Sequence, residues 1–285
     1  MIKISFKFWA MKFLLPVFVI FILFSCGNTK PLIDVEDDAN DEIENAVFTS
    51  GVESIPLYSR DKMDTVTSSI SYQFYTHPSK AYQDSINVMI NIYLRGNTDA
   101  EGEPIIPTSS VSQQTMKDAL NYFSELYNSE IEMYEEDEEY FGAIWSMEKS
   151  VSISDARFEY AQLSLSGWEY SGGAHGNAWS QDILVDLKTG NTLYLEDFFT
   201  DVSALIAIAG VIFRADQELG ADDDLGDAGF WFEDGEFRLN ENFMFGNETI
   251  EFLYNQYEIA PYAAGIIELS IPLTKVKHLL KRKID

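Results

Sequence analysis

Cysteine and histidine are scarce in this sequence of 285 residues. The one cysteine, Cys26, cannot form an intrachain disulfide, and its isolation excludes a zinc site built from several cysteines. The three histidines, His77, His175 and His278, lie far apart in the chain, with no acid or nucleophile at a diagnostic spacing. We therefore expect no metal site, no cofactor and no enzymatic activity, and a hydrolase without a recognisable motif remains the alternative.

Basic residues are also few. The chain has 19 Lys and Arg against 47 Asp and Glu, for a net charge of −28. Such a field repels nucleic acid and anionic membrane surfaces, and it favours cationic partners. Solubility in a crowded compartment is the simpler interpretation of the same charge. The composition therefore excludes a nucleic-acid-binding protein and leaves a cationic partner as a hypothesis.

The apolar run Leu14–Phe24 is short for a transmembrane helix and typical of the hydrophobic region of a signal peptide. Lysines but no acids precede it, and Leu23-Phe24-Ser25-Cys26-Gly27 follows, which resembles the bacterial lipobox. We expect residues 1–25 to be a signal peptide and Cys26 to carry diacylglyceryl and palmitate-like acyl chains, which together anchor firmly. An uncleaved N-terminus with a free thiol is the alternative.

Residues 26–50 are acidic and poor in large apolar side chains, so we interpret them as a flexible tether to the membrane. Loss of the three lysines before Cys26 would leave 16 basic against 47 acidic residues, a net charge of −31. Gly27, after the lipidated cysteine, carries no obvious inner-membrane retention signal. We therefore expect a bacterial envelope protein on the outer membrane, facing the periplasm or the cell surface.

The folded part is expected to have two small α+β domains, each with an antiparallel sheet packed with one or two helices. Residues 51–165 would form the first, with strands near Val52–Tyr75, a strand over Ser85–Arg95, and later strands over Trp145–Ile153 and Arg157–Leu165. A capping box at Ser110–Gln113 predicts the start of its helix. Its core-facing side chains are spaced three and four apart: Met116, Leu120, Phe123, Tyr127, Ile131 and Tyr134.

Residues 166–285 would form the second domain. A strand over Trp179–Leu187, a turn at Lys188–Asn191 and a return strand over Thr192–Leu195 predict a hairpin. A helix over Val202–Leu219 is expected to bury Leu205, Ile208, Ile212 and Leu219. Further strands are expected at Phe243–Phe245, Thr249–Tyr254 and Ile267–Ile271.

Four motifs occur in order: Ser171-Gly172-Gly173-Ala174-His175-Gly176, Asp186-Leu187-Lys188-Thr189-Gly190, Leu195-Glu196-Asp197-Phe198-Phe199 and Tyr254–Gly265. Together they resemble the extracytoplasmic domains shared by the lysozyme-sensing anti-sigma factor RsiV and the peptidoglycan deacetylase PdaC. The likeness covers about residues 165–275, and the order of strands and helix upstream is similar to the companion N-terminal domain. The deacetylase's catalytic aspartate and two zinc-binding histidines have no counterpart among the scattered histidines here.

Two loops are the candidate binding elements. Glycines in 171–176 indicate a strained turn that presents backbone groups, and the tyrosines and proline of 257–265 suit contact with a sugar or a protein. A hydrogen-bonded structural role for His175, and a rigid loop that merely covers the core, are the alternatives. The candidate ligand-binding residues are Tyr170, Gly172, Gly173, His175, Gly176, Tyr257, Glu258, Pro261 and Tyr262.

The resemblance implies a ligand outside the cytoplasm, a cationic protein of the lysozyme type. The alternative ligand is peptidoglycan or another envelope glycan. Acids at 222, 224 and 233 have a partial EF-hand spacing, but Asp227 stands where that loop requires glycine, so no calcium site is expected.

Overall fold

The computed structural model describes residues 47–76, 80–96, 110–133, 143–154 and 159–282. Its larger sheet has six strands that lie in chain order. These are β1 (Val47–Tyr58), β2 (Thr65–Thr76), β3 (Ser146–Ser154), β4 (Tyr160–Tyr170), β5 (Asn177–Asp186) and β6 (Thr192–Leu193). All neighbouring pairs are antiparallel except β2–β3, which is parallel.

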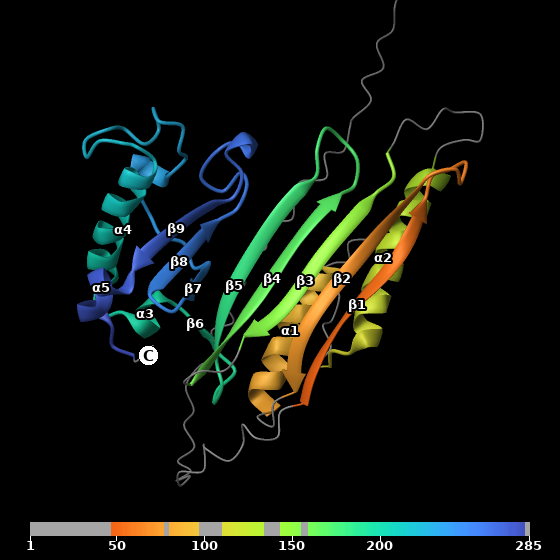
Figure 1. Ribbon diagram of the computed structural model, residues 1–285, viewed down its shortest axis with the longest axis horizontal. Helices are drawn as coiled ribbons and strands as arrows, with labels where there is room; N and C mark the ends of the chain where they lie inside the picture. The colour runs from red at the N-terminus through yellow and green to blue at the C-terminus, as the bar shows by residue number, and fades with distance from the viewer. Residues whose placement is uncertain (1–46, 77–79, 97–109, 134–142, 155–158, 283–285) are drawn as a thin grey trace, which may run out of the picture. The chain divides into compact units, whose positions relative to one another are not determined.

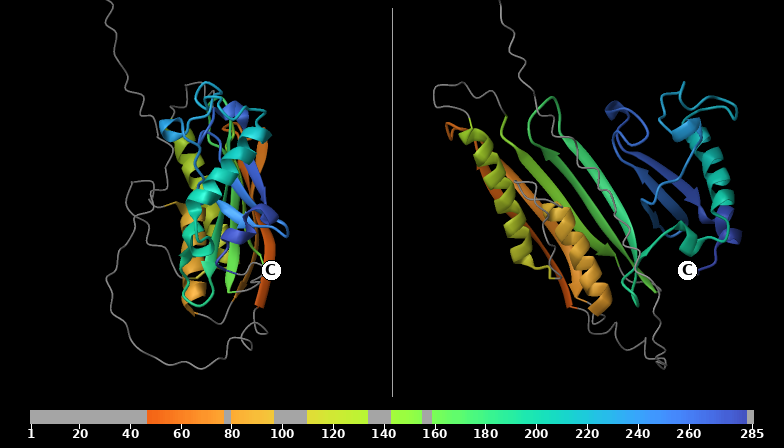
Figure 2. Two further views of the ribbon diagram at one scale, coloured as in Figure 1. Left: turned by 90° about the vertical axis from the view of Figure 1, so that its left-hand side faces the viewer. Right: turned by 180° about the vertical axis from the view of Figure 1, so that it is seen from behind.

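Two helices, α1 (Lys80–Arg95) and α2 (Gln113–Glu132), lie on one face of this sheet (Figures 1 and 2). Both belong to the connection between β2 and β3, and a parallel pair needs such a crossover. The predicted strand over Ser85–Arg95 is therefore wrong, because this segment lies within α1. Its apolar residues satisfy both periods, but the buried ones, Tyr82, Ile86, Ile90 and Leu94, recur every four residues as in a helix.

Helix α2 has the predicted core face, with Met116, Leu120, Phe123 and Tyr127 buried. Its cap lies two residues later than expected: Ser112 is the N-cap, and its N–H donates to Thr115 Oγ1 at 3.0 Å. The helix ends at Glu132, and the predicted core position 134 and most of the acidic run that follows lie outside the described residues.

The other face of the larger sheet is lined with serines. In the strand register Ser71, Ser150, Ser166 and Ser180 form one row across β2–β5, and Trp168 lies in the next row opposite Glu148 and Ala178. Alternation along β4 explains the difference between the faces, because Ala161, Leu163 and Leu165 are buried on the helix side. One face of the sheet is thus packed against helices and the other is polar along the serine rows, except where Tyr160 and Leu184 are buried in the core of the second sheet.

A second, antiparallel sheet contains β7 (Phe243–Phe245), β8 (Thr249–Tyr254) and β9 (Ile267–Pro272). It packs with α4 (Val202–Asp216) and α5 (Leu273–Val276) around a core rich in phenylalanine. Shorter turns are α3 (Leu195–Phe198), η2 (Glu233–Gly235), η3 (Tyr262–Ala264) and η4 (Lys277–Leu279). The hairpin strand predicted over Thr192–Leu195 is shorter than expected, since α3 begins at Leu195.

Helix α4 buries Leu205, Ala209 and Phe213 completely. Of the inner-face residues predicted for it, Leu205 is confirmed, whereas Ile208 and Ile212 are only half-buried. The helix ends at Asp216, before the predicted end at Leu219, so Leu219 lies beyond the helix and is also half-buried. No helix in the part of the chain described by the structure is long and apolar enough to cross a membrane.

Side-chain amides join the second sheet to the edge of β5. Asn255 Oδ1 and Asn242 Oδ1 accept from the N–H groups of Ser180 and Asp182, each at 2.8 Å. Gln256 Oε1 accepts from Ala178 N–H at 3.0 Å, and both asparagine side chains donate to Ser180 O. These amides occupy the positions that a neighbouring strand would take.

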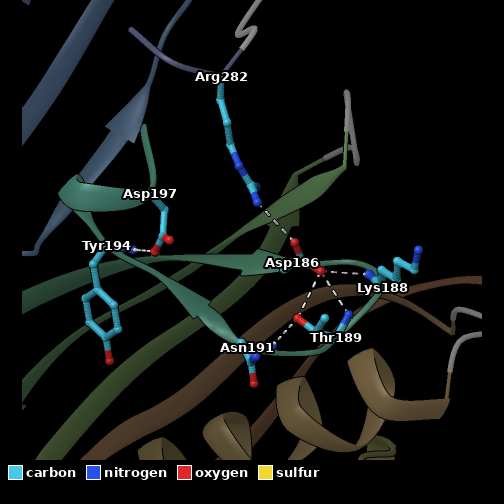
Figure 3. Close-up of polar contacts among 7 residues, drawn as sticks. All are labelled: Asp186, Lys188, Thr189, Asn191, Tyr194, Asp197 and Arg282. Atoms are coloured by element: carbon cyan, nitrogen blue, oxygen red, sulfur yellow. Dashed lines mark hydrogen bonds and ion pairs between the residues drawn. The ribbon is translucent and has the colours of Figure 1, made fainter. Parts of the chain in front are cut away.

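The β5–β6 turn is held by one carboxylate (Figure 3). Asp186 Oδ1 accepts from Thr189 N–H at 2.8 Å, Thr189 Oγ1 at 3.0 Å and Lys188 N–H at 3.1 Å. Asp186 Oδ2 lies 3.5 Å from an Arg282 guanidinium nitrogen, which ties the C-terminal residues to this turn. The predicted turn is confirmed, and its carboxylate also pairs with Arg282.

The α+β class is confirmed: two sheets of six and three strands, each packed with helices. The boundary predicted between residues 165 and 166 falls inside β4, and the larger sheet continues beyond it to β6. The predicted tether overlaps β1, which starts at Val47. The predicted signal peptide and the predicted lipidation site Cys26 lie outside the described residues.

Candidate functional site

The two loops singled out from the sequence lie against each other. The first, 171–176, joins β4 to β5, and the second, 257–265, joins β8 to β9. The His175 and Tyr262 rings stack with their centroids 3.7 Å apart, and the Tyr257 ring centroid lies 5.6 Å from that of Tyr262. The structure therefore brings together residues that are about eighty positions apart in the chain.

Hydrogen bonds fix this contact. Tyr262 Oη donates to Gly176 O at 2.9 Å, and His175 Nδ1 lies 3.0 Å from the same oxygen. A carbonyl only accepts, so Nδ1 donates this bond, and Nε2 lies 3.4 Å from Tyr257 Oη. The imidazole thus has two polar partners and stacks on Tyr262. These contacts fit a structural role for His175, and they also fit a role as part of a binding surface.

The turn uses glycines for two different reasons. Gly172 and Gly173 have φ values of 101° and 92°, which side-chain-bearing residues rarely adopt. Gly176 is covered by the indole of Trp168, and an added Cβ would lie 2.5 Å from that ring. Tyr170 Oη donates to Gly173 O at 2.9 Å and closes the turn from the other side.

Trp168 is a residue that the sequence analysis missed. It is 38% exposed and covers Gly176, and its ring stacks with that of Tyr170 at a centroid distance of 6.5 Å. Trp168 and Tyr170 are two residues apart in a strand and directly precede the glycine-rich loop. This spacing puts both rings on one face of the sheet, and it could have identified Trp168 as a neighbour of the loop. We call Trp168, Tyr170, His175, Tyr257 and Tyr262 the aromatic surface.

Glu258 and Pro261 have structural roles in the second loop. Glu258 accepts from Asn255 N–H at 2.8 Å and from the Asn240 side chain at 2.7 Å, which closes the turn after β8. Pro261 caps the single turn η3 that carries Tyr262. Tyr257 has φ = 64°, a strained conformation for a tyrosine, and its side chain is 50% exposed. Strain at an exposed aromatic residue is typical of functional loops.

The buried side of β4 positions the aromatic surface. Lys149, on β3, donates to Tyr93 O and Leu94 O at the C-terminal end of α1, at 3.3 and 3.2 Å. Burial lowers the pKa of Lys149, and the charge of Glu169 opposes this shift. Burial likewise raises the pKa of Glu169, against the effect of Lys149. Tyr93 Oη also donates to Ser166 O, so helix α1 holds β4 just before Trp168.

This arrangement offers stacking and hydrogen bonding, and no acid or nucleophile contacts His175 among the described residues. Within the same residues, no group of three or more His, Cys, Asp or Glu side chains is placed to hold a metal ion. The site as described is a group of stacked and hydrogen-bonded rings around Gly176.

Comparisons with known proteins bear on the second half of the chain. Residues 196–274 match the family model described as "Protein of unknown function (DUF3298)". No match is found among the curated proteins.

Two solved structures are similar over most of the chain. A member of the DUF3298 family from Bacteroides fragilis is 22% identical with a TM-score of 0.62, over 84% of this chain and 94% of that one. A DUF3298 family protein from Pseudomonas aeruginosa is 15% identical with a TM-score of 0.50, over 83% and 94%. Residues 196–274 are therefore similar to the DUF3298 family, and the chain has a fold like that of solved proteins of that family.

Proposed function

We propose that this protein is a lipid-anchored, non-enzymatic receptor of the bacterial envelope that binds a cationic protein of the lysozyme type through the aromatic surface. The observation that carries the proposal is the joining of the two loops into one exposed group of rings around Gly176. Aromatic rings supply large contact area at low entropic cost, and they are enriched in the energetically important parts of protein interfaces.

Charge supports a cationic ligand. The net charge of −28 attracts a basic protein over distance and raises its association rate. Such attraction weakens with salt, because the Debye length falls from about 10 Å at 0.1 M to about 3 Å at 1 M. Specificity would then come from the aromatic surface, since charge alone binds any cation.

A glycan is the second candidate, and the polar face of the larger sheet favours it. The row of serine hydroxyls across β2–β5 lies beside the exposed Trp168 ring, so hydroxyl donors and a stacking platform adjoin. Peptidoglycan chains present sugar faces and hydroxyl groups that match both.

The test measures the affinity of lysozyme for a soluble form of the protein that lacks Cys26. Two tyrosine variants are compared, one inside the aromatic surface and one outside it as a control. Tyr257 and Tyr58 are each 50% exposed, but only Tyr257 lies in the aromatic surface. Tyr257→Ala should weaken binding about 10- to 30-fold, the range of an interface hot spot, through faster dissociation. Tyr58→Ala should leave the affinity unchanged.

A double variant, His175→Ala with Tyr262→Ala, should weaken binding further, with circular dichroism to verify that the fold persists. Equal affinity of parent, Tyr257→Ala and the double variant for lysozyme, or equal affinity of the parent for cytochrome c, would refute the lysozyme proposal. Co-sedimentation with insoluble peptidoglycan that depends on Trp168 would then favour the glycan.

A further inference from the structure

The outward face of α4 is apolar. The helix buries Leu205, Ala209 and Phe213 against the second sheet, yet Val211, on the outward side, is 70% exposed, and Ala207 is exposed as well. A surface helix normally carries charged or polar residues on that side. Packing in the core of its own domain therefore does not explain why this face of α4 is apolar.

The face forms one wall of an open groove of about 480 Å³. Gly210 lies at the point where Phe237 approaches, and a Cβ there would be 3.2 Å from the Phe237 ring. Apolar lining residues are Ile206, Ala207, Gly210, Val211, Leu219 and Phe237.

The loop after α4 is fixed by internal hydrogen bonds. The guanidinium of Arg214 donates to Asp223 O at 2.8 Å and to Gly220 O at 3.4 Å. Asp223 in turn accepts from Gly220 N–H at 2.7 Å. The Leu219 side of the groove is thus preformed, which lowers the entropic cost of binding there.

Acidic residues border the groove. Asp216, Glu218, Asp222 and Glu236 are each next in sequence to a lining residue, and all four are exposed. Residues 214–238 contain nine Asp and Glu and two Arg. Arg214 lines the groove, with its guanidinium on Gly220 O and Asp223 O, and Arg238 pairs with Glu233 and Asp234. The groove therefore combines an apolar floor with a border on which exposed carboxylates outnumber arginines.

We propose that this groove, which we call the α4 groove, binds an amphipathic helix of a partner protein, with aliphatic side chains in the groove and Lys or Arg against the acidic rim. Helix-in-groove recognition uses such apolar anchors, and opposite charges on the rim orient the helix and speed its association. A second copy of this chain would bring two acidic rims together, and anionic lipid would be repelled by the same rim.

The test uses a peptide of Leu and Lys, about 18 residues long so that it spans five helical turns, labelled with a fluorophore. Its Leu/Glu counterpart has the same apolar face and the opposite charge. We expect the soluble protein without Cys26 to bind the Leu/Lys peptide by fluorescence anisotropy and not the Leu/Glu peptide. Val211→Gln should weaken binding about 10-fold or more.

The rim is tested by Glu218→Gln with Asp222→Asn, which should weaken binding and reduce its salt dependence. Two controls match these changes: Val52→Gln, at a valine 64% exposed on β1, and Glu125→Gln with Glu132→Gln on α2. Both controls should bind like the parent.

Equal binding of the two peptides, or equal loss in the controls, would refute the proposal. A concentration-dependent dimer that Val211→Gln abolishes, measured by sedimentation, would assign the groove to a second copy and overturn it too. Lysozyme binding and its dependence on Tyr257 are separate readouts, so this test does not depend on the proposed receptor function.

Discussion

Asp182 and Asp186 lie on the same strand but have opposite electrostatic environments. Burial raises the pKa of Asp182, opposed by the hydrogen bond from Ser164, while Glu251 raises the pKa further. Burial also raises the pKa of Asp186, but hydrogen bonds from Thr189 and Lys188, together with Arg282, outweigh it and lower the value below 3.8. Ionisation of Asp182 therefore lowers the stability of the fold, whereas ionisation of Asp186 raises it.

We expect opposite pH dependences from the two isosteric variants. Asp186→Asn should lower the free energy of unfolding at pH 7 by about 1–2 kcal/mol, because it removes charge-assisted hydrogen bonds. The lowered pKa means that this deficit is full above about 3.9, the pKa of unfolded Asp, and shrinks as pH falls through the folded value.

Asp182→Asn should show the reverse. The raised pKa means that the wild type loses stability as pH rises through the folded value, which lies above 3.8, so the variant should gain about 1 kcal/mol relative to it by pH 7. Urea unfolding of both variants at pH 7 and at about pH 2.5, below the pKa of unfolded Asp at about 3.9, measures this. A parallel pH response of the two variants would show that the assigned environments are wrong.

The β5–β6 turn shows how one position can set the geometry of an element. Gly190 has φ = 72°, and an added Cβ would lie 2.5 Å from the carbonyl oxygen of Ala81 in the first turn of α1. The turn can approach the helix this closely only because residue 190 lacks a side chain. The motif Asp186–Gly190 thus packs β5 and β6 against α1.

Gly190→Ala should therefore lower the free energy of unfolding by about 2–4 kcal/mol, the sum of strain at positive φ and a backbone clash. Gly229→Ala is the matched control, because Gly229 also has positive φ, 95°, and no atom lies within 4 Å of the place that its Cβ would occupy. The control should lose only about 1 kcal/mol. Similar losses for the two variants, measured by thermal denaturation, would argue against the Ala81 contact.

Local patterns predicted most elements, and they failed where two periods coincide. Strands β3, β5, β7, β8 and β9 and helices α2 and α4 lie within a few residues of their predicted positions. Residues 85–95 failed because Ile86 and Ile90 fit both a strand and a helix, and only the packing of Tyr82 and Leu94 distinguishes them. That error removed the crossover and hid the parallel β2–β3 pair.

The candidate site was predictable in part. The loops of His175 and Tyr262 were identified from glycine, tyrosine and family motifs, and the structure places them in contact. Trp168 was missed because alternation alone does not reveal which face of a strand the helices cover. The contacts of the Asn242, Asn255 and Gln256 amides with β5 join residues far apart in sequence, which no local pattern reports. The bond that Glu258 accepts from Asn255 is local, but it gives Glu258 a role within the turn that the sequence analysis did not assign.

At the scale of the whole molecule, a net charge of −28 and the proposed lipid anchor act in different ways. Charge keeps the folded part away from anionic membrane surfaces, so attachment would depend on the acyl chains at Cys26. We expect Cys26→Ala to release the protein from the membrane fraction. Cell fractionation with immunodetection measures this, and Ser25→Ala, a small-to-small change before the cysteine, should remain attached.

Membrane association of Cys26→Ala equal to that of the parent would refute the lipoprotein assignment. Release of Ser25→Ala as well would point instead to a general failure of export.

The amide-covered edge of β5 has a consequence for self-assembly. A bare strand edge will pair with any extended chain, and repetition of that pairing builds fibrils. Here the side chains of Asn242, Asn255 and Gln256 already accept from the N–H groups of residues 178, 180 and 182. These N–H groups of β5 are therefore not free to pair with a strand of another molecule. The long edge strand on the other side of the larger sheet is β1, which contains Pro56, a residue without an N–H group. The side-chain amides therefore protect this stretch of β5 from the strand addition that would otherwise link one molecule to the next.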